Sequence, residues 1–167
     1  PSGSVLEIDD EQWYDTYDLL VMSVVRTIRE AAPYLKESEA GTIVTIASRT
    51  VKDAVDKMVL SNAVRMGVIG LEKTISKELA PAIRANAVLP GSHETVRVEN
   101  LIEQSVDRGD YDSYEEGYRD RISKVPLDRL GSPEEFGATV AFLSSPLSGF
   151  INGAAVPIDG GSVGSNL

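Results

Sequence analysis

Three short β-branched segments alternate with long amphipathic helices along this chain, and that order is its strongest constraint on the fold. The segments with strand patterns cover residues 41–48, 83–89 and 154–158. Helical patterns cover residues 9–36 and 53–80, and a further helix begins at Ser132. Such alternation predicts an α/β fold in which helices pack in layers on a parallel sheet.

The first helix is predicted over residues 9–36, where apolar residues recur at steps of three and four. Such steps place side chains on one face of a helix. Pro33 lies near the end of the helix and is expected to kink or tighten its last turn. The residues that define the apolar face are Trp13, Tyr17, Leu20, Val24, Ile28, Ala31 and Leu35.

Residues 41–48 follow as a β-branched strand bounded by glycine, which we expect to be buried on both faces. The helix predicted over residues 53–80 ends at Pro81 and carries a stripe of small residues. Glycine within a helix costs about 1 kcal/mol relative to alanine, so we expect another helix or backbone to approach closely here. The stripe consists of Ala63, Gly67 and Gly70.

Residues 92–128 are polar and acidic, with two amphipathic patches, and predict a helical lid outside the main layers. Because little apolar area is buried there, we expect the lid to be mobile. Ser132 and Glu135 then have the spacing of a capping box, with Pro133 in the first turn of the next helix.

Composition excludes several classes of function. The 167 residues carry a net charge of −10, which argues against nucleic acid or an anionic membrane as a partner, since both require positive charge. The chain has no cysteine, so disulfides, cysteine–zinc sites and thiol catalysis are excluded, and one histidine excludes a His-rich metal site. The acidity fits either an ordinary acidic cytoplasmic protein or adaptation to high salt. No targeting segment is apparent, so we expect a cytoplasmic location.

Three strands make a small sheet for helices of this length, and the first strand would leave an apolar edge open. The missing strands come either from residues upstream or from another chain. Residues 1–4 have neither an initiator methionine nor the pattern of a signal peptide. We therefore expect residues 1–167 to be a single-domain fragment of a longer protein.

Five motifs, in this order and spacing, resemble the short-chain dehydrogenase/reductase family, with similarity to sugar or polyol dehydrogenases and 3-oxoacyl-carrier-protein reductases. The resemblance implies a Rossmann-like three-layer fold, of which this chain is the C-terminal part. The family's glycine-rich dinucleotide turn would lie before Pro1, so the site for NAD or NADP would be completed upstream. The motifs cover residues 41–48, 78–81, 84–91, 126–135 and 151–161.

The family's catalytic residues carry over to positions where this sequence mostly departs from the pattern. The catalytic serine falls on Ser48, and the tyrosine and lysine of Tyr-x-x-x-Lys fall on Ser61 and Arg65. The catalytic asparagine of the preceding helix falls on Leu20. Positions four apart share a helix face, so we expect Ser61 and Arg65 to point into one cleft.

These departures change the proton chemistry. A phenol has a pKa near 10 that a neighbouring lysine lowers, whereas the aliphatic hydroxyl of Ser61 is a much weaker acid. The guanidinium of Arg65 keeps its charge but does not deprotonate, so it cannot relay a proton. Loss of a general acid typically costs about 10²–10⁴-fold in rate. The family's usual route of catalysis is therefore not expected here.

A second motif is better preserved. Residues 90–95 resemble the Pro-Gly-x-x-x-Thr loop of the family, which implies cofactor contacts by Pro90, Gly91, His93 and Thr95. His93 is either a substitute acid, since histidine titrates near neutrality, or a loop residue that contributes only its backbone. No metal site is expected, because the acidic residues 107–116 fit a solvated face better.

Three functions remain open at this stage. The first is an NAD(P)-dependent oxidoreductase acting on an alcohol or carbonyl of a small molecule, such as a sugar or polyol, with non-standard catalytic residues Ser48, Ser61 and Arg65. The second is a catalytically silent dinucleotide-binding or scaffold protein, and the third is a truncated product. The resemblance also implies a homodimer or homotetramer.

Overall fold

A computed structural model describes residues 3–165 of the chain. The prediction that Pro1 and Ser2 continue from an upstream segment concerns residues outside this range. The protein is an α/β structure with three parallel strands in the order β1-β2-β3. Strand β1 is Gly41–Ile46, β2 is Ile83–Pro90 and β3 is Ala155–Ile158. The parallel sheet predicted from the alternating pattern is thus confirmed.

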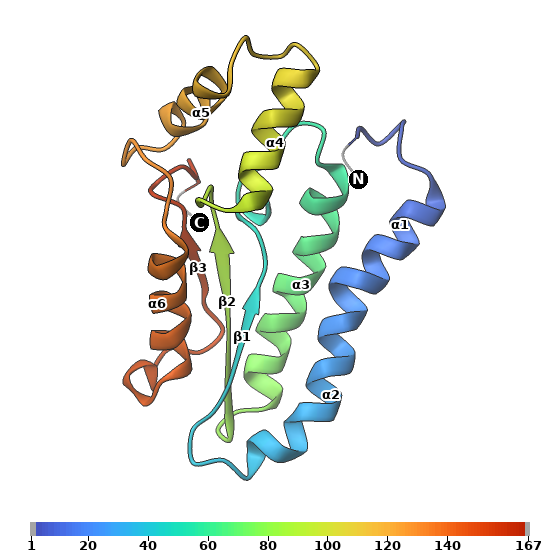
Figure 1. The fold of residues 1–167 in the computed structure, drawn as a ribbon. Coiled ribbons are helices and arrows are strands. Elements are labelled where there is room, and N and C mark those ends of the chain that lie inside the picture. Colours follow the sequence, from blue (N-terminus) through green and yellow to red (C-terminus); the bar gives the residue numbers. More distant parts are fainter. Residues whose placement is uncertain (1–2, 166–167) are drawn as a thin grey trace.

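Helices cover both faces of this sheet, which gives the three layers of a Rossmann-like fold (Figure 1). Helices α2 and α3 contact the strands on one face, and α6 contacts them on the other. The bounds are α1 Asp10–Tyr17, α2 Ser23–Lys36, α3 Val59–Glu78, α4 Val96–Asp107, α5 Tyr114–Ser123 and α6 Pro133–Ser144. Helices α4 and α5 lie beyond the carboxyl ends of the strands, at the top of Figure 1.

Strand β2 forms the centre of the core. Ile83, Ala85, Ala87, Val88 and Leu89 have no solvent-exposed surface. A strand flanked by strands on both edges and by helices on both faces must be apolar almost throughout. This burial explains why five of the seven residues in the segment 83–89 are apolar, the two polar ones being Arg84 and Asn86.

Two asparagines tie β2 to the segment before β3. The buried amide of Asn86 donates to the Ile151 carbonyl and accepts from the Ala154 backbone N–H, each at 3.0 Å. Asn152 accepts from Ala85 N–H at 3.0 Å and donates to the Ser76 carbonyl at 2.8 Å. These bonds satisfy backbone groups that the core would otherwise leave unpaired. They fix β3 against the rest of the sheet.

The N-terminal helical run differs from the prediction in its buried face. A π-helical turn over Asp18–Met22 separates α1 from α2, so the run is not one regular helix. Val21 is 5% exposed, whereas Tyr17, predicted on the apolar face, is 51% exposed. Because a π-helical turn contains an extra residue, it shifts the side chains that follow around the axis. Pro33 lies inside α2.

Two further predictions are corrected in detail. Strand β1 ends at Ile46, and Ile46 itself is 56% exposed, so the strand is not buried on both faces. Helix α3 begins at Val59 rather than at residue 53. Of the small-residue stripe, Gly67 faces Val21, but nothing lies near the position of a Cβ on Gly70. Close approach therefore explains one glycine only.

The capping box predicted before the last long helix is confirmed. The Ser132 hydroxyl accepts from the Glu135 backbone N–H at 3.3 Å, and the Glu135 carboxylate accepts from the Ser132 N–H at 2.8 Å. Pro133 occupies the first turn of α6, where its missing N–H costs nothing. Within residues 3–165, no helix combines the length and apolar character needed to cross a membrane.

Candidate functional site

Ser48 lies just beyond the carboxyl end of β1. Its hydroxyl accepts a hydrogen bond from the Thr50 backbone N–H at 3.2 Å and so caps the short 3₁₀ turn Arg49–Val51. A short polar side chain in this position holds the turn against the end of the strand. The edge of an open α/β sheet where strands end is where such folds bind ligands.

Ser61 lies in the first turns of α3 and is joined to the same turn. Its hydroxyl is 3.1 Å from the hydroxyl of Thr50, which is buried. Ser48 and Ser61 are therefore connected through Thr50, whose side-chain role was not anticipated from the sequence. The only signal in the sequence was its place two residues after Ser48.

Arg65 follows one helical turn after Ser61 and faces the same strand end. Its guanidinium donates to the carbonyls of Ile46 at 3.4 Å and Ala47 at 3.1 Å. Burial lowers the pKa of Arg65 from its ordinary value. The structure thus brings Ser48, Ser61 and Arg65 together at the end of β1.

Leu20, which we predict to stand at the position of the family's asparagine, belongs to an apolar cluster. It packs with Trp13 against the buried side chains of Val21, Val64 and Val68. An apolar side chain in this position cannot hold a water molecule by hydrogen bonds. A polar relay through this position is therefore absent.

The loop after β2 begins with a close backbone contact. The Gly91 N–H donates to the Ile158 carbonyl at 2.9 Å, and a Cβ on Gly91 would lie 2.6 Å from the Asp159 Cα. Only glycine permits this approach without a shift of the backbone. Pro90 ends β2, and the Thr95 hydroxyl accepts from the Val98 N–H as the N-cap of α4.

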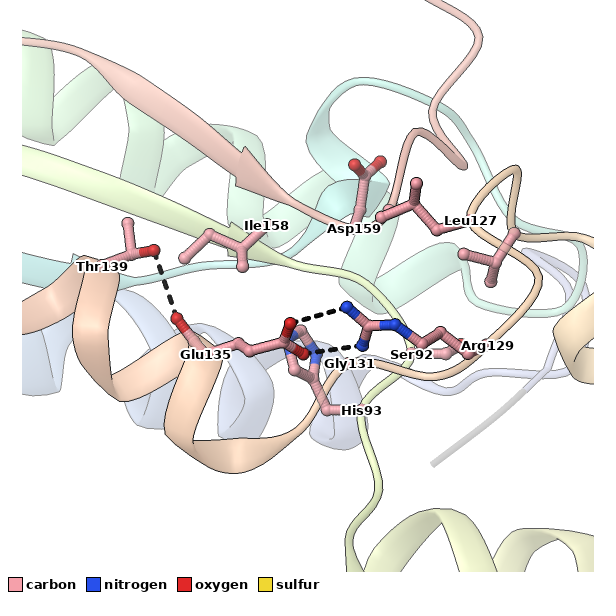
Figure 2. A pocket seen from close by; sticks show the side chains of 11 residues that line it. Ser92, His93, Leu127, Arg129, Gly131, Glu135, Thr139, Ile158 and Asp159 are labelled. Atoms are coloured by element: carbon pink, nitrogen blue, oxygen red, sulfur yellow. Dashed lines mark hydrogen bonds and ion pairs between the residues drawn. The ribbon is translucent and has the colours of Figure 1, made fainter.

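His93 is 8% exposed, and its imidazole faces α6 (Figure 2). The ring packs edge-on to Phe136 with centroids 5.4 Å apart, and Nδ1 lies 3.2 Å from the Gly91 carbonyl oxygen. A Cβ on Gly131 would lie 2.7 Å from the ring, so this glycine makes room for the histidine. His93 is thereby held in one orientation.

A cavity of about 190 Å³ adjoins His93 at the carboxyl end of β3 (Figure 2). Arg129 and Glu135 form an ion pair beside it, with nitrogen–oxygen distances of 2.8 and 2.6 Å. The Arg129 guanidinium, together with the Ser132 backbone N–H, lowers the pKa of Glu135 to about 2. The pair links the loop 126–131 to the first turn of α6.

A buried carboxyl group in α3 was not anticipated from the sequence. Glu72 is 2% exposed, and its Oε2 accepts from the Thr45 hydroxyl at 2.7 Å. Its Oε1 is buried and has no hydrogen-bond partner among residues 3–165. Burial raises the pKa of Glu72 to about 7. The only signal in the sequence was an acidic residue among the apolar residues of a predicted helix.

Acidic residues do not gather into a metal-binding group. Within the part of the chain that the structure describes, no cluster of three or more His, Cys, Asp or Glu side chains is arranged to hold a metal ion. In the lid, the Tyr111 hydroxyl and the Lys124 ammonium instead both donate to the Asp120 carboxylate.

Comparison with known proteins identifies the family of this chain. A family model described as enoyl-(acyl-carrier-protein) reductase matches residues 1–163. The chain belongs to the short-chain dehydrogenase/reductase family. A 3-oxoacyl-[acyl-carrier-protein] reductase of Thermotoga maritima is 31% identical over 95% of this chain and 60% of its own length. The chain therefore spans about three-fifths of this curated relative.

Solved structures of the short-chain dehydrogenase/reductase family superpose closely. An aldohexose dehydrogenase of Thermoplasma acidophilum has a TM-score of 0.90 at 28% identity, over 97% of this chain and 63% of that one. A short-chain oxidoreductase of Pseudomonas aeruginosa, described as containing an atypical catalytic center, has a TM-score of 0.83 at 29% identity, over 96% and 60%. These likenesses confirm the predicted Rossmann-like fold.

Proposed function

We propose that residues 1–167 form the C-terminal part of an NAD(P)-dependent oxidoreductase that acts on an alcohol or carbonyl group of a sugar or polyol. The observation that carries this proposal is the assembly of Ser48, Ser61 and Arg65 at the end of β1. Relatives described as an aldohexose dehydrogenase and an L-sorbose reductase in complex with NADPH support the substrate class and the cofactor.

The residues present fit the nicotinamide end of a dinucleotide. The loop 90–95 offers the carbonyl of Gly91, the backbone of His93 and the hydroxyl of Thr95. Arg65 offers a half-buried cation without a carboxylate partner among residues 3–165. When bound, the dinucleotide supplies or accepts the hydride. The phosphate-binding turn would come from residues that precede this chain.

The chain's own residues would position the reacting group rather than exchange its proton. The Ser48 hydroxyl would hold the substrate oxygen, and the Ser61 hydroxyl would orient it. Arg65 would stabilise negative charge that develops on this oxygen, because a guanidinium keeps its charge even where burial lowers its pKa. The proton would be exchanged with water, and His93 would contribute its backbone only, since its ring packs against Phe136.

The test is turnover by the natural polypeptide that contains these residues. Aldoses, ketoses and polyols are assayed with NADH, NADPH and their oxidised forms at 340 nm. Ser48→Ala and Arg65→Met are each expected to lower kcat by roughly 100-fold or more. Arg119→Met, at an exposed position of α5, serves as the control and keeps the wild-type rate. Turnover that survives both site variants would contradict the proposal.

A catalytically silent dinucleotide-binding protein is the alternative, and the surroundings of Leu20 favour it. An apolar cluster occupies the place of the family's asparagine, and the Ser61 hydroxyl already has Thr50 as its partner. Cofactor binding by calorimetry, without turnover on any alcohol or carbonyl tested, would establish this alternative.

We also propose that the protein forms a homodimer or homotetramer in which α6 and the edge of β3 meet a second copy. Phe142 is 43% exposed on α6, and Leu147 and Phe150 in the following segment are 85% and 105% exposed. Large apolar side chains gathered in this way mark interaction surfaces. Light scattering of Phe142→Ser/Phe150→Ser is expected to show a smaller assembly than wild type, and an unchanged mass would refute this interface.

A further inference from the structure

A second cavity, also of about 190 Å³, lies where the three strand ends meet the lid. Arg49 follows β1, Ser92 follows β2 and Ser162 follows β3, and all three line it. Its other side is formed by Ser105 of α4 and by Arg121 in α5. Helices α4 and α5 lie beyond the carboxyl ends of the strands in Figure 1, and the lining residues place the cavity between these strand ends and the lid.

Positive charge is in excess in this cavity. Three basic side chains, of Arg49, Arg121 and Lys124, line it, against one acidic side chain, of Asp120. The Lys124 ammonium forms an ion pair with the Asp120 carboxylate, which also accepts from the Tyr111 hydroxyl at 2.7 Å. These contacts lower the pKa of Asp120 and keep it ionised. The Asp120 carboxylate is bonded to Lys124 and is also attracted by Arg121, so the lining keeps a net excess of two positive charges.

Neither guanidinium has a hydrogen-bonded partner among residues 3–165, although the charge of Arg121 contributes to the lowered pKa of Asp120. Arg49 and Arg121 are half-buried, yet their side chains form no hydrogen bond or ion pair with any residue from 3 to 165. Arg29, Arg97 and Arg119 also lack such a partner in this range, but they are exposed and water solvates them. A cation held partly out of water without a partner is costly. A bound anion would supply negative charge beside the two guanidinium groups and so offset this cost.

The kind of ligand follows from the chemistry of arginine. A guanidinium offers a planar fork of donors that matches the paired oxygens of a carboxylate or phosphate group. The chain as a whole carries a net charge of −10, so its overall field repels anions and a local cluster must overcome it. We propose that this cavity binds a phosphoryl or carboxylate group of the substrate, with Arg49 and Arg121 as its ligands.

The position of the cavity assigns this anion to the substrate, an assignment that rests on the proposed oxidoreductase function. Arg49 is the next residue after Ser48, which would hold the reacting oxygen. Ser92 belongs to the loop 90–95 that would face the nicotinamide. An anion between these two points and the lid lies beside the reacting carbon. The substrate would then be an acidic or phosphorylated sugar or polyol rather than a neutral one.

Calorimetry of the natural polypeptide with inorganic phosphate and with acetate tests the site without any need for turnover. Ionic strength is held constant with chloride. Arg49→Gln and Arg121→Gln are each expected to weaken anion binding about 10–100-fold, the value of a charge-assisted hydrogen bond. Arg119→Gln on the same helix is the matched control and is expected to bind as wild type does. Circular dichroism confirms that each variant is folded.

A second titration separates the two sources of anion. With saturating NADPH present, phosphate or acetate is expected to bind as before, since the cofactor leaves the cavity open to the substrate. Displacement of both anions by NADPH would overturn the assignment to the substrate. Absence of anion binding to the wild type, or wild-type affinity in both arginine variants, would overturn the site itself. Neither result depends on whether the protein reduces any sugar.

Discussion

The hydroxyl of Ser61 lies 3.1 Å from that of Thr50, at the position where we predict the tyrosine of the short-chain dehydrogenase/reductase family to fall. Two aliphatic hydroxyls bond to each other and lack the acidity of a phenol. If Ser61 and Arg65 occupy the positions we predict for the family's tyrosine and lysine, the site has no phenol to act as general acid.

Restoring the acid tests this view. The double variant Ser61→Tyr/Arg65→Lys is expected to raise kcat of the natural polypeptide by roughly 100-fold or more, the usual value of general acid catalysis. Ser61→Phe/Arg65→Lys, which adds the ring without its hydroxyl, should give no increase. Equal rates in the two double variants would show that a missing phenol is not what limits the site.

Glu72 predicts a pH dependence of stability. Because burial raises its pKa from 4.5 to about 7, the folded state binds this proton more tightly than the unfolded chain does. The contribution to stability is therefore greatest below pH 4.5, decreases between pH 4.5 and 7, and stays low above pH 7. The full difference is about 3 kcal/mol.

Glu72→Gln removes this titration. Urea unfolding is expected to show a variant more stable than wild type at pH 8, with the gain shrinking as the pH falls to 4.5. Glu78→Gln, at the exposed end of the same helix, is the control and should parallel the wild type. A constant difference between wild type and Glu72→Gln at all pH values would contradict the assignment.

Glu135 titrates in the opposite sense. Its ion pair with Arg129 and its bond from the Ser132 N–H lower its pKa to about 2 from 4.5. Its stabilisation is therefore present above pH 4.5 and is lost as the pH falls toward 2. Glu135→Gln should be less stable than wild type at pH 7, with a difference that narrows between pH 4.5 and 3. Glu134→Gln, one residue away, should show no such convergence.

Gly91 is expected to tolerate no side chain. Gly91→Ala would place a Cβ 2.6 Å from the Asp159 backbone, and overpacking of this kind costs about 1–3 kcal/mol. Gly164→Ala, where nothing lies within 4 Å, serves as the control and should leave the melting temperature unchanged. A Gly91→Ala variant as stable as wild type would mean that the loop can move away from β3.

Local sequence patterns predicted the helices and strands, but they did not always predict which face of each is buried. The capping box at Ser132 and the strand 83–89 were read correctly because each depends on neighbouring residues. The burial of Val21 instead of Tyr17 was missed because the π-helical turn changes the helical period. The proposed catalytic positions came from a family resemblance, whereas composition alone excluded only whole classes of function.

The sequence by itself determined the order of helices and strands and the family, and it predicted that Ser61 and Arg65 stand where the family has tyrosine and lysine. Only the tertiary structure decided which distant side chains meet, such as Glu72 with Thr45 and Arg49 with Arg121 at one cavity. The periodicity of apolar residues indicates on which face of a helix or strand a residue lies. The partner on another element depends on how the sheet and helices pack, and hence on contacts between segments far apart in the chain.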